Sequence, residues 1–125
     1  MLRYDTNTLN YKYLCIFLWF SLEINVITDV PKIRKFKFDE NIKEGEVATV
    51  MCSASSAMKP IDFKWEKNGQ QIAESSENPR IQDGVIHSVL IFDSVKSSDD
   101  GNYTCIVTGP SGQDRHSAQL IVKGK

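Results

Sequence analysis

Apolar and polar residues alternate over short stretches of the chain after residue 30, and turn-forming residues separate these stretches. In one stretch the apolar positions are Ala48, Val50 and Cys52, each two residues apart. This spacing puts the three side chains on one face of a β-strand, whereas a helix brings together residues three or four apart. Several such stretches between turns predict an all-β sandwich or barrel.

About seven strands are expected from this pattern. They lie in residues 32–38, 46–53, 61–67, 80–82, 85–95, 102–109 and 115–122. Asn68-Gly69 is a typical hairpin turn, and Asp83-Gly84 is a second turn signal. Pro31 and the lysines after it discourage pairing with further strands, so we expect the first strand to lie at a sheet edge.

The N-terminal part of the chain has a different character. The run from Tyr13 to Leu22 carries no charge, but it is too short to span a membrane as a helix, which needs about 20 apolar residues. It is typical of the apolar core of a secretory signal peptide. We therefore predict a signal peptide over residues 1–28 and one domain over residues 29–125. An uncleaved signal anchor is the alternative.

Cleavage before Asp29 would remove Cys15 and leave two cysteines, Cys52 and Cys105. An even number of cysteines in a secreted chain favours a disulfide over a metal site or a reactive thiol. This bond would close a loop of roughly 54 residues and stabilise the fold by about 4 kcal/mol.

The charge of the chain and its motifs limit the classes of function. The net charge of −1 argues against nucleic acid as a partner, because such binding needs a surplus of basic residues on one face. We predict no catalytic residue, no metal site and no cofactor, since the sequence has no phosphate-binding loop and no nucleophile motif. His87 and His116 fall on different expected strands without further ligands nearby. A binding or structural role is therefore favoured over enzymatic chemistry.

Cys52, Trp65, Tyr103 and Cys105 have a characteristic spacing. Trp65 follows Cys52 by thirteen residues, Cys105 follows Trp65 by forty, and Tyr103 precedes Cys105 by two. The arrangement resembles the immunoglobulin fold, and the pattern from Leu90 to Cys105 resembles its I-set class. This resemblance covers residues 31–122. It implies an all-β, immunoglobulin-like (I-set) two-sheet sandwich with one inter-sheet disulfide.

The resemblance also implies roles for individual residues. Trp65 fills the core against the disulfide, and Tyr103 packs its ring inside while its hydroxyl bonds to the backbone near a tight corner. Asp99 caps this corner and pairs with Arg80. Gly101 lets the backbone turn tightly.

The outer face of one sheet is the candidate for binding. Leu90 and Phe92 are expected to point inward, so the residues between and before them point outward. The outer face of a half-solvated sheet is normally polar, and a contiguous apolar patch there often marks an interface. The predicted interface, on the sheet of strands A, B, E and D, comprises Val47, Thr49, Met51, His87, Val89 and Ile91.

Several stretches, among them PKIRKFKF, IDFKWEKNGQQI and SVLIFDSV, are similar to the Down syndrome cell adhesion molecule (Dscam) family of arthropods. They most resemble its variable seventh immunoglobulin domain, and a signal peptide directly before such a domain is similar to the shortened Dscam proteins of chelicerates. Variable domains of this family bind an identical copy on another cell through the A-B-E-D sheet. The resemblance therefore implies homophilic cell–cell adhesion.

The expected location is extracellular, either at the cell surface within a longer membrane protein or as a secreted protein. The expected partners are an identical domain on an opposing cell and neighbouring immunoglobulin domains, without nucleic acid and without membrane insertion of the mature domain. An alternative is a secreted immune-recognition module that binds foreign ligands through its loops at 53–59 and 108–113. A passive spacer within a longer receptor is a further alternative.

Asn102-Tyr103-Thr104 is an N-x-[ST] sequon, which predicts glycosylation of Asn102 in a secreted protein. Because Tyr103 and Cys105 are expected to point inward, Asn102 and Thr104 should point outward.

Overall fold

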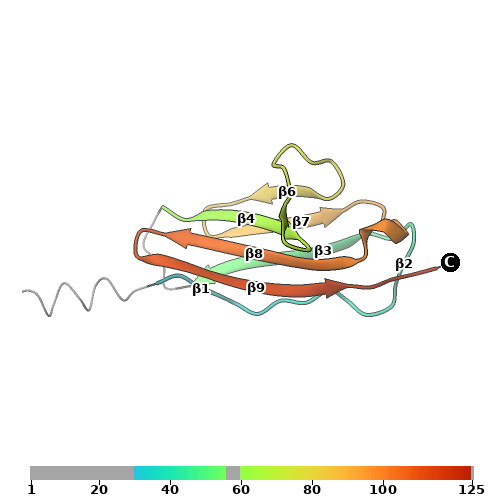
Figure 1. Ribbon diagram of the computed structural model, residues 1–125, viewed down its shortest axis with the longest axis horizontal. Helices are drawn as coiled ribbons and strands as arrows, with labels where there is room; N and C mark the ends of the chain where they lie inside the picture. Colours follow the sequence, from blue (N-terminus) through green and yellow to red (C-terminus); the bar gives the residue numbers. More distant parts are fainter. Residues whose placement is uncertain (1–29, 56–59, 125) are drawn as a thin grey trace, which may run out of the picture.

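The computed structural model describes residues 30–55 and 60–124. Two four-stranded sheets lie face to face (Figure 1), one in the order β1-β3-β7-β6 and the other in the order β5-β4-β8-β9. All neighbouring strands within these sheets are antiparallel. The chain thus forms the all-β sandwich predicted from the alternation. The predicted signal peptide, residues 1–28, lies outside the described residues.

The strands are short, and one turn of 3-10 helix interrupts them. Their bounds are β1 Lys32–Ile33, β2 Ile42–Lys43, β3 Ala48–Ser55, β4 Asp62–Lys67, β5 Gln70–Gln71, β6 Arg80–Asp83, β7 His87–Phe92, η1 Ser97–Asp99, β8 Gly101–Gly109, β9 Gly112–Leu120 and β10 Val122–Lys123. The β4–β5 hairpin turns at Asn68-Gly69, and both residues have positive φ, as the tight turn between twisted strands requires.

The core fills the space between the two sheets. Alternate residues of β3 are buried, beginning with Ala48, Val50 and Cys52, so the predicted register of this strand is confirmed. The other sheet contributes Phe63 and Trp65 from β4 and Val107 from β8. The buried cluster comprises Phe38, Ile42, Ala48, Val50, Cys52, Ala54, Phe63, Trp65, Leu90, Phe92, Val95, Tyr103, Cys105, Val107, Ala118 and Leu120.

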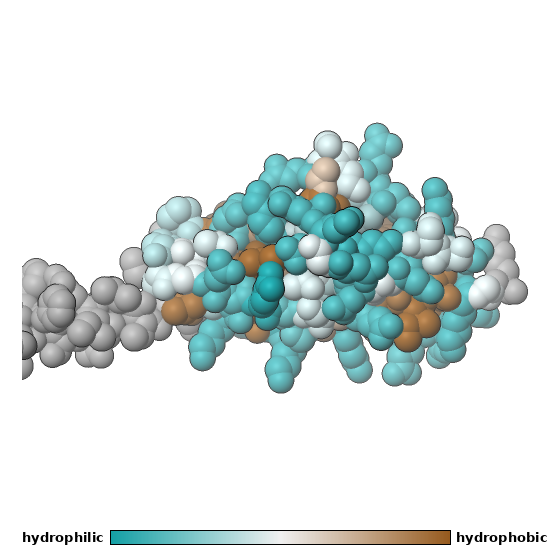
Figure 2. All heavy atoms as spheres, in the orientation of Figure 1, coloured by the Kyte–Doolittle hydropathy of each residue, from teal (hydrophilic) through white to brown (hydrophobic). Residues whose placement is uncertain are grey.

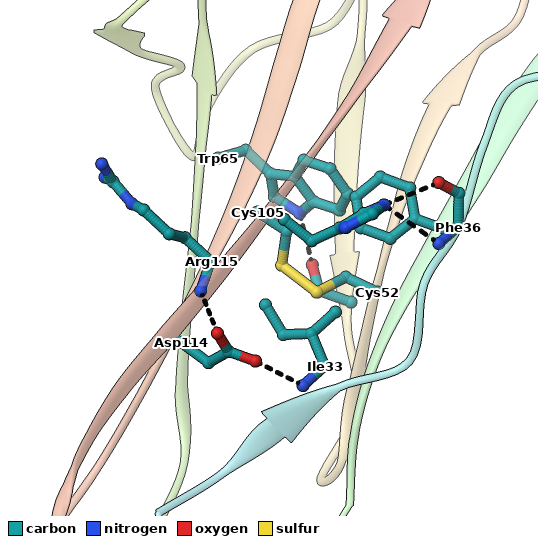
Figure 3. The surroundings of a disulfide bond; sticks show 9 residues. Ile33, Phe36, Cys52, Trp65, Cys105, Asp114 and Arg115 are labelled. Carbon is teal, nitrogen blue, oxygen red and sulfur yellow. Dashed lines mark hydrogen bonds between the residues drawn. A yellow bond between two sulfur atoms is a disulfide. The ribbon is translucent and has the colours of Figure 1, made fainter.

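A disulfide and an indole join the sheets at the centre of this core (Figure 3). Cys52 of β3 is bonded to Cys105 of β8, with Cα atoms 6.4 Å apart. Trp65 lies beside the disulfide and is 1% exposed. Its Nε1 donates a hydrogen bond of 2.8 Å to Oγ of Ser88, which is fully buried on β7. The indole therefore spans from one sheet to the other without leaving its donor unsatisfied.

The first strand differs from the prediction. A continuous strand was expected over 32–38, but β1 ends at Ile33, and the chain then passes from the edge of the first sheet to the edge of the second. Two side chains of β9 hold it there. Asp114 Oδ2 accepts a hydrogen bond from Ile33 N at 2.9 Å. His116 Nε2 lies 3.3 Å from Phe36 N and 2.9 Å from Phe36 O.

The chain after Ile33 is thus bound to β9 through the side chains of Asp114 and His116 and not through backbone-to-backbone hydrogen bonds. This explains why β1 is short. Beyond this point β2 pairs in parallel with β10, with Ile42 beside Val122. Phe38, between the two segments, is buried in the core and packs edge-on against Tyr103 at a centroid distance of 5.7 Å. Residues 32–43, which we call the N-terminal segment, thus cover the β3 edge of one sheet and the β9 edge of the other.

We expect the paired variant Cys52→Ala/Cys105→Ala to lose about 4 kcal/mol of unfolding free energy, because the disulfide closes a loop with a sequence separation of 53 and so restricts the unfolded chain. Urea denaturation of residues 29–125, followed through Trp65 fluorescence, measures this loss. The variant Ser75→Ala/Ser94→Ala, which changes two exposed serines, is the matched control. Equal stability of the two variants would contradict the expectation.

Candidate functional site

The stretch from Asp99 to Cys105 forms a structural corner. Tyr103 is fully buried, and its hydroxyl donates a hydrogen bond of 2.6 Å to the carbonyl oxygen of Asp99. Asp99 Oδ2 in turn accepts from the backbone N of Lys96 at 2.7 Å and from Nδ2 of Asn78 at 3.4 Å. These hydrogen bonds hold η1 and the start of β8 in place, so Asp99 has a structural role.

One predicted detail of this corner is wrong. Arg80 does not pair with Asp99. The Nε and Nη2 atoms of Arg80 instead donate to the carboxylate of Asp93 at 2.8 and 3.2 Å. The reason is that β6 places Arg80 on the outer face of its sheet, while Asp99 is buried. Gly101 is not in the left-handed region. A β-carbon there would lie 3.1 Å from Cε of Lys67, a contact that a small movement of this flexible side chain would relieve.

The outer face of the β1-β3-β7-β6 sheet collects the residues predicted as an interface. Met51 lies opposite Val89, Thr49 opposite Ile91 and Ser53 opposite His87. Residues directly opposite each other in an antiparallel pair share a face. The register therefore brings the predicted side chains of β3 and β7 together, with Val47 directly before β3.

Exposure differs among these residues. The side chains of Val47 and Met51 are the most open, at 64% and 54% exposed. Thr49 is exposed, and His87 and Val89 are half-buried. A contiguous apolar patch on the outer face of a sheet often marks an interaction site, whereas single exposed apolar residues are common.

Ile91 is buried, at 9% exposed, although the alternation predicted an open position. Arg80 of β6 lies directly opposite it, and the guanidinium reaches Asp93, two residues beyond Ile91. The aliphatic part of Arg80 therefore lies beside Ile91 and shields it. Thr49 flanks the other side. Ile91 therefore packs beneath Arg80 and contributes little to the solvent-exposed surface of this sheet face.

The β6–β7 turn adds apolar surface that the sequence reading missed. Val85 and Ile86 are 67% and 48% exposed, because β7 begins only at His87. An open groove next to them is lined by Arg34, Met51, Ser53, Ala54, Ile86 and His87. The His87 ring lies over Gly84, where a β-carbon would come within 2.4 Å of Cε1. The Asp83-Gly84 turn signal, next to two apolar residues, could have identified this tip.

Charged residues of the N-terminal segment separate along the molecule. Arg34 lines the groove with Met51. Asp39 and Glu40 line a different groove, beside Ile121 and Lys123. They lie there because the chain has by then crossed to β9 and β10.

Other predicted features occupy separate places. Asn102 is exposed on β8, on the opposite sheet from Met51. The alternative binding loops are mostly strand or outside the described residues, since β3 extends to Ser55 and β8 and β9 meet at Gly109 and Gly112. Within residues 30–55 and 60–124, no group of three His, Cys, Asp or Glu side chains is placed to hold a metal ion. No helix in that part of the chain is long and apolar enough to cross a membrane.

The motif, the two sheets and the central disulfide together define the family, and the model of the immunoglobulin domain matches residues 40–118. The chain belongs to the immunoglobulin domain family. The match takes in both cysteines, Trp65 and the Tyr103 corner. The immunoglobulin-like sandwich with one inter-sheet disulfide is thereby confirmed.

Several known immunoglobulin proteins are similar to this chain. Human palladin is 33% identical over 88 residues, which are 70% of this chain and 6% of palladin. The cell adhesion molecule Dscam2 of Drosophila melanogaster is 29% identical over 102 residues, which are 81% of this chain and 5% of Dscam2. The crystal structure of the Dscam1 Ig7 domain, isoform 5, has 28% identity and a TM-score of 0.71, and the match covers 74% of this chain and 96% of that domain.

These similarities support a Dscam-like immunoglobulin domain that is related to cell adhesion molecules. They match one module only, since the chain spans a small fraction of the curated relatives. Domains similar to this chain thus occur both in palladin and in the cell adhesion molecule Dscam2. Membership of the family therefore establishes the fold, and a function has to be inferred from the residues exposed on the surface.

The phenol of Tyr103 provides a direct test of the corner. Burial, with the nearby charges of Asp99 and Asp100, raises the pKa of Tyr103 well above its ordinary value, which is about 10. A raised folded-state pKa means that the stabilisation is complete below about pH 10 and is lost as pH rises toward the folded pKa. In residues 29–125 Tyr103 is the single tyrosine. We expect no tyrosinate absorbance in the folded domain until alkali unfolds it.

In denaturant the same group should titrate near pH 10, and Tyr103→Phe, which removes the phenol, serves as the blank. Tyrosinate appearing near pH 10 while circular dichroism still reports a folded sheet would contradict the buried corner.

Proposed function

We propose that the chain is an extracellular recognition module that binds an identical copy through the outer face of the β1-β3-β7-β6 sheet, the A-B-E-D sheet of the immunoglobulin fold. The observation that carries the proposal is the exposed apolar surface of Val47 and Met51 on that face. Val89 and Ile86 extend this surface along β7 and the adjoining turn. We call this set the outer patch. Binding, without catalysis or a cofactor, is the act proposed.

A flat sheet face suits a contact between two copies. An isologous contact uses the same surface on both partners and therefore needs a patch that is complementary to itself. Apolar side chains at the centre meet this requirement, since they have no charge to oppose their own copies. Arg34 at the rim of the groove supplies a charge that would favour one orientation over others.

The energy of such a contact is modest. Burying roughly 300 Å² of apolar surface contributes on the order of 7 kcal/mol, and association costs of about 4 kcal/mol or more oppose it. We therefore expect weak binding between single domains. Display of many copies on two opposing surfaces would strengthen it without new contacts.

The likeness to the Dscam1 Ig7 domain and to the cell adhesion molecule Dscam2 supports this proposal. So does the uncharged run in residues 13–22, which favours secretion. Under this proposal the domain acts beside further immunoglobulin domains of a longer chain, at the cell surface or after secretion. The mature domain touches neither nucleic acid nor the membrane interior.

Glutamate substitutions in the outer patch test the proposal. We expect Met51→Glu and Val47→Glu to weaken self-association by more than about tenfold, because each variant would force a charge out of water into an apolar contact. Beads coated with the domain should aggregate for wild type and remain dispersed for both variants. Sedimentation velocity of the soluble domain measures the same loss.

Ile121→Glu is the matched control. Ile121 is 57% exposed and lines a groove that Met51 does not line, so its change adds the same charge at similar exposure and should leave aggregation intact. Thermal melting must show that all three variants are folded. If beads with Met51→Glu and Val47→Glu still aggregate, the face is wrong. If wild-type beads never aggregate, homophilic binding is wrong, and a foreign ligand or a spacer role takes its place.

A further inference from the structure

Asn102 is the acceptor of the one N-x-[ST] sequon in the sequence. It is exposed on β8, and its neighbour Tyr103 is fully buried, so the Asn102 side chain points away from the core. Among the described residues, the side-chain amide of Asn102 has no hydrogen-bond partner. The backbone of Asn102 is instead held by Asn68. Asn102 N donates to Asn68 Oδ1 at 2.9 Å, and Asn68 N donates to Asn102 O at 2.8 Å. The amide is thus presented to solvent on a rigid support.

Thr104, the third residue of the sequon, has a different environment. It is 9% exposed, and its Oγ1 lies 2.7 Å from Oγ of Ser117 on β9. The strand β8 is central in its sheet, between β4 and β9. Once β9 has paired with β8, the hydroxyl that defines the sequon is therefore covered and hydrogen-bonded. An enzyme that must recognise this hydroxyl has access to it only while β8 is unpaired.

We propose that Asn102 carries an N-linked glycan, and that the glycan is attached before β8 and β9 pair. The donor is an oligosaccharide linked to a lipid through pyrophosphate. Nδ2 forms a bond to the first sugar carbon and loses one proton, while the bond from that carbon to the pyrophosphate breaks and the lipid pyrophosphate leaves. No oxidant or reductant is needed. The step depends on entry into the secretory pathway, and in that respect it rests on the proposed function.

The position of Asn102 gives the glycan a consequence for binding. Asn102 is the second residue of β8 and lies opposite Gln119, near the end of β9. Hydrophilic side chains dominate this face of the molecule (Figure 2). A glycan is bulky and strongly hydrated, so it would cover the β5-β4-β8-β9 sheet and disfavour close contact there. The outer patch, on the opposite sheet, remains free.

The first experiment maps the modification. The full chain is expressed in insect cells, and the secreted protein is treated with peptide N-glycosidase in water labelled with oxygen-18. We expect a loss of one oligosaccharide mass and a labelled aspartate in place of Asn102. Asn102→Gln should abolish the mass shift, whereas Thr104→Ser, which retains a hydroxyl, should keep it. Secreted wild-type protein without a shift would overturn the proposal.

Secretion itself can fail for a separate reason. In that case a proven secretion leader replaces residues 1–28 and the same mass measurement decides the glycan, so failure of the leader and failure of the glycan are distinguished. Bead aggregation distinguishes glycosylation from self-association. Asn102→Gln should aggregate as wild type does, while Met51→Glu should be glycosylated but remain dispersed.

The second experiment tests the order of events. Purified oligosaccharyltransferase with its lipid-linked donor is given the unglycosylated chain in two states, folded with its disulfide intact and reduced in denaturant that is then diluted. We expect modification of the unfolded chain and at least tenfold less of the folded chain. Equal modification of both states would show that pairing of β8 with β9 does not protect the sequon, and would overturn the proposed order.

Discussion

The contact between Trp65 and the Cys52–Cys105 disulfide is the constraint on which the rest of the molecule depends. The disulfide ties β3 to β8, and the indole reaches from β4 to Ser88 on β7. Both sheets are thus fixed at their centres. Because side chains alternate along each strand, fixing one inward residue per strand assigns every other residue to the core or to an outer face. The residues that make up the two outer faces follow from this central contact.

The two outer faces then differ in chemistry. The β3 and β7 face has Val47 and Met51 open to solvent, while the β8 and β9 face bears Asn102, Gln119 and mostly hydrophilic neighbours. One face is suited to contact with protein and the other to water or sugar. The edge of β9 is closed by the N-terminal segment through Asp114 and His116. This edge is not left as a template for strand addition.

Much of this arrangement could be predicted from short-range pattern. The burial of alternate residues in β3, the Asn68-Gly69 turn and the cysteine pair all depend on local periodicity or on spacing within a well-defined motif. The Tyr103 corner is similar, since its hydroxyl bonds to Asp99, four residues earlier. Ser88 was not found from the sequence, because a serine on an apolar strand carries no signal that it will meet an indole on another sheet. Val85 and Ile86 were assigned to a strand, because periodicity alone does not locate where a strand begins.

The sequence by itself determined the sandwich, the disulfide and which residues of β3 and β7 share a face, because period-two alternation and motif spacing are properties of neighbouring residues. Only the tertiary structure decided that Ile91 is covered, because Arg80 and Asp93 meet across a strand pairing. It also decided where the first strand ends. His116 contacts Phe36 across 80 positions of the chain, and no local pattern encodes a contact at that distance.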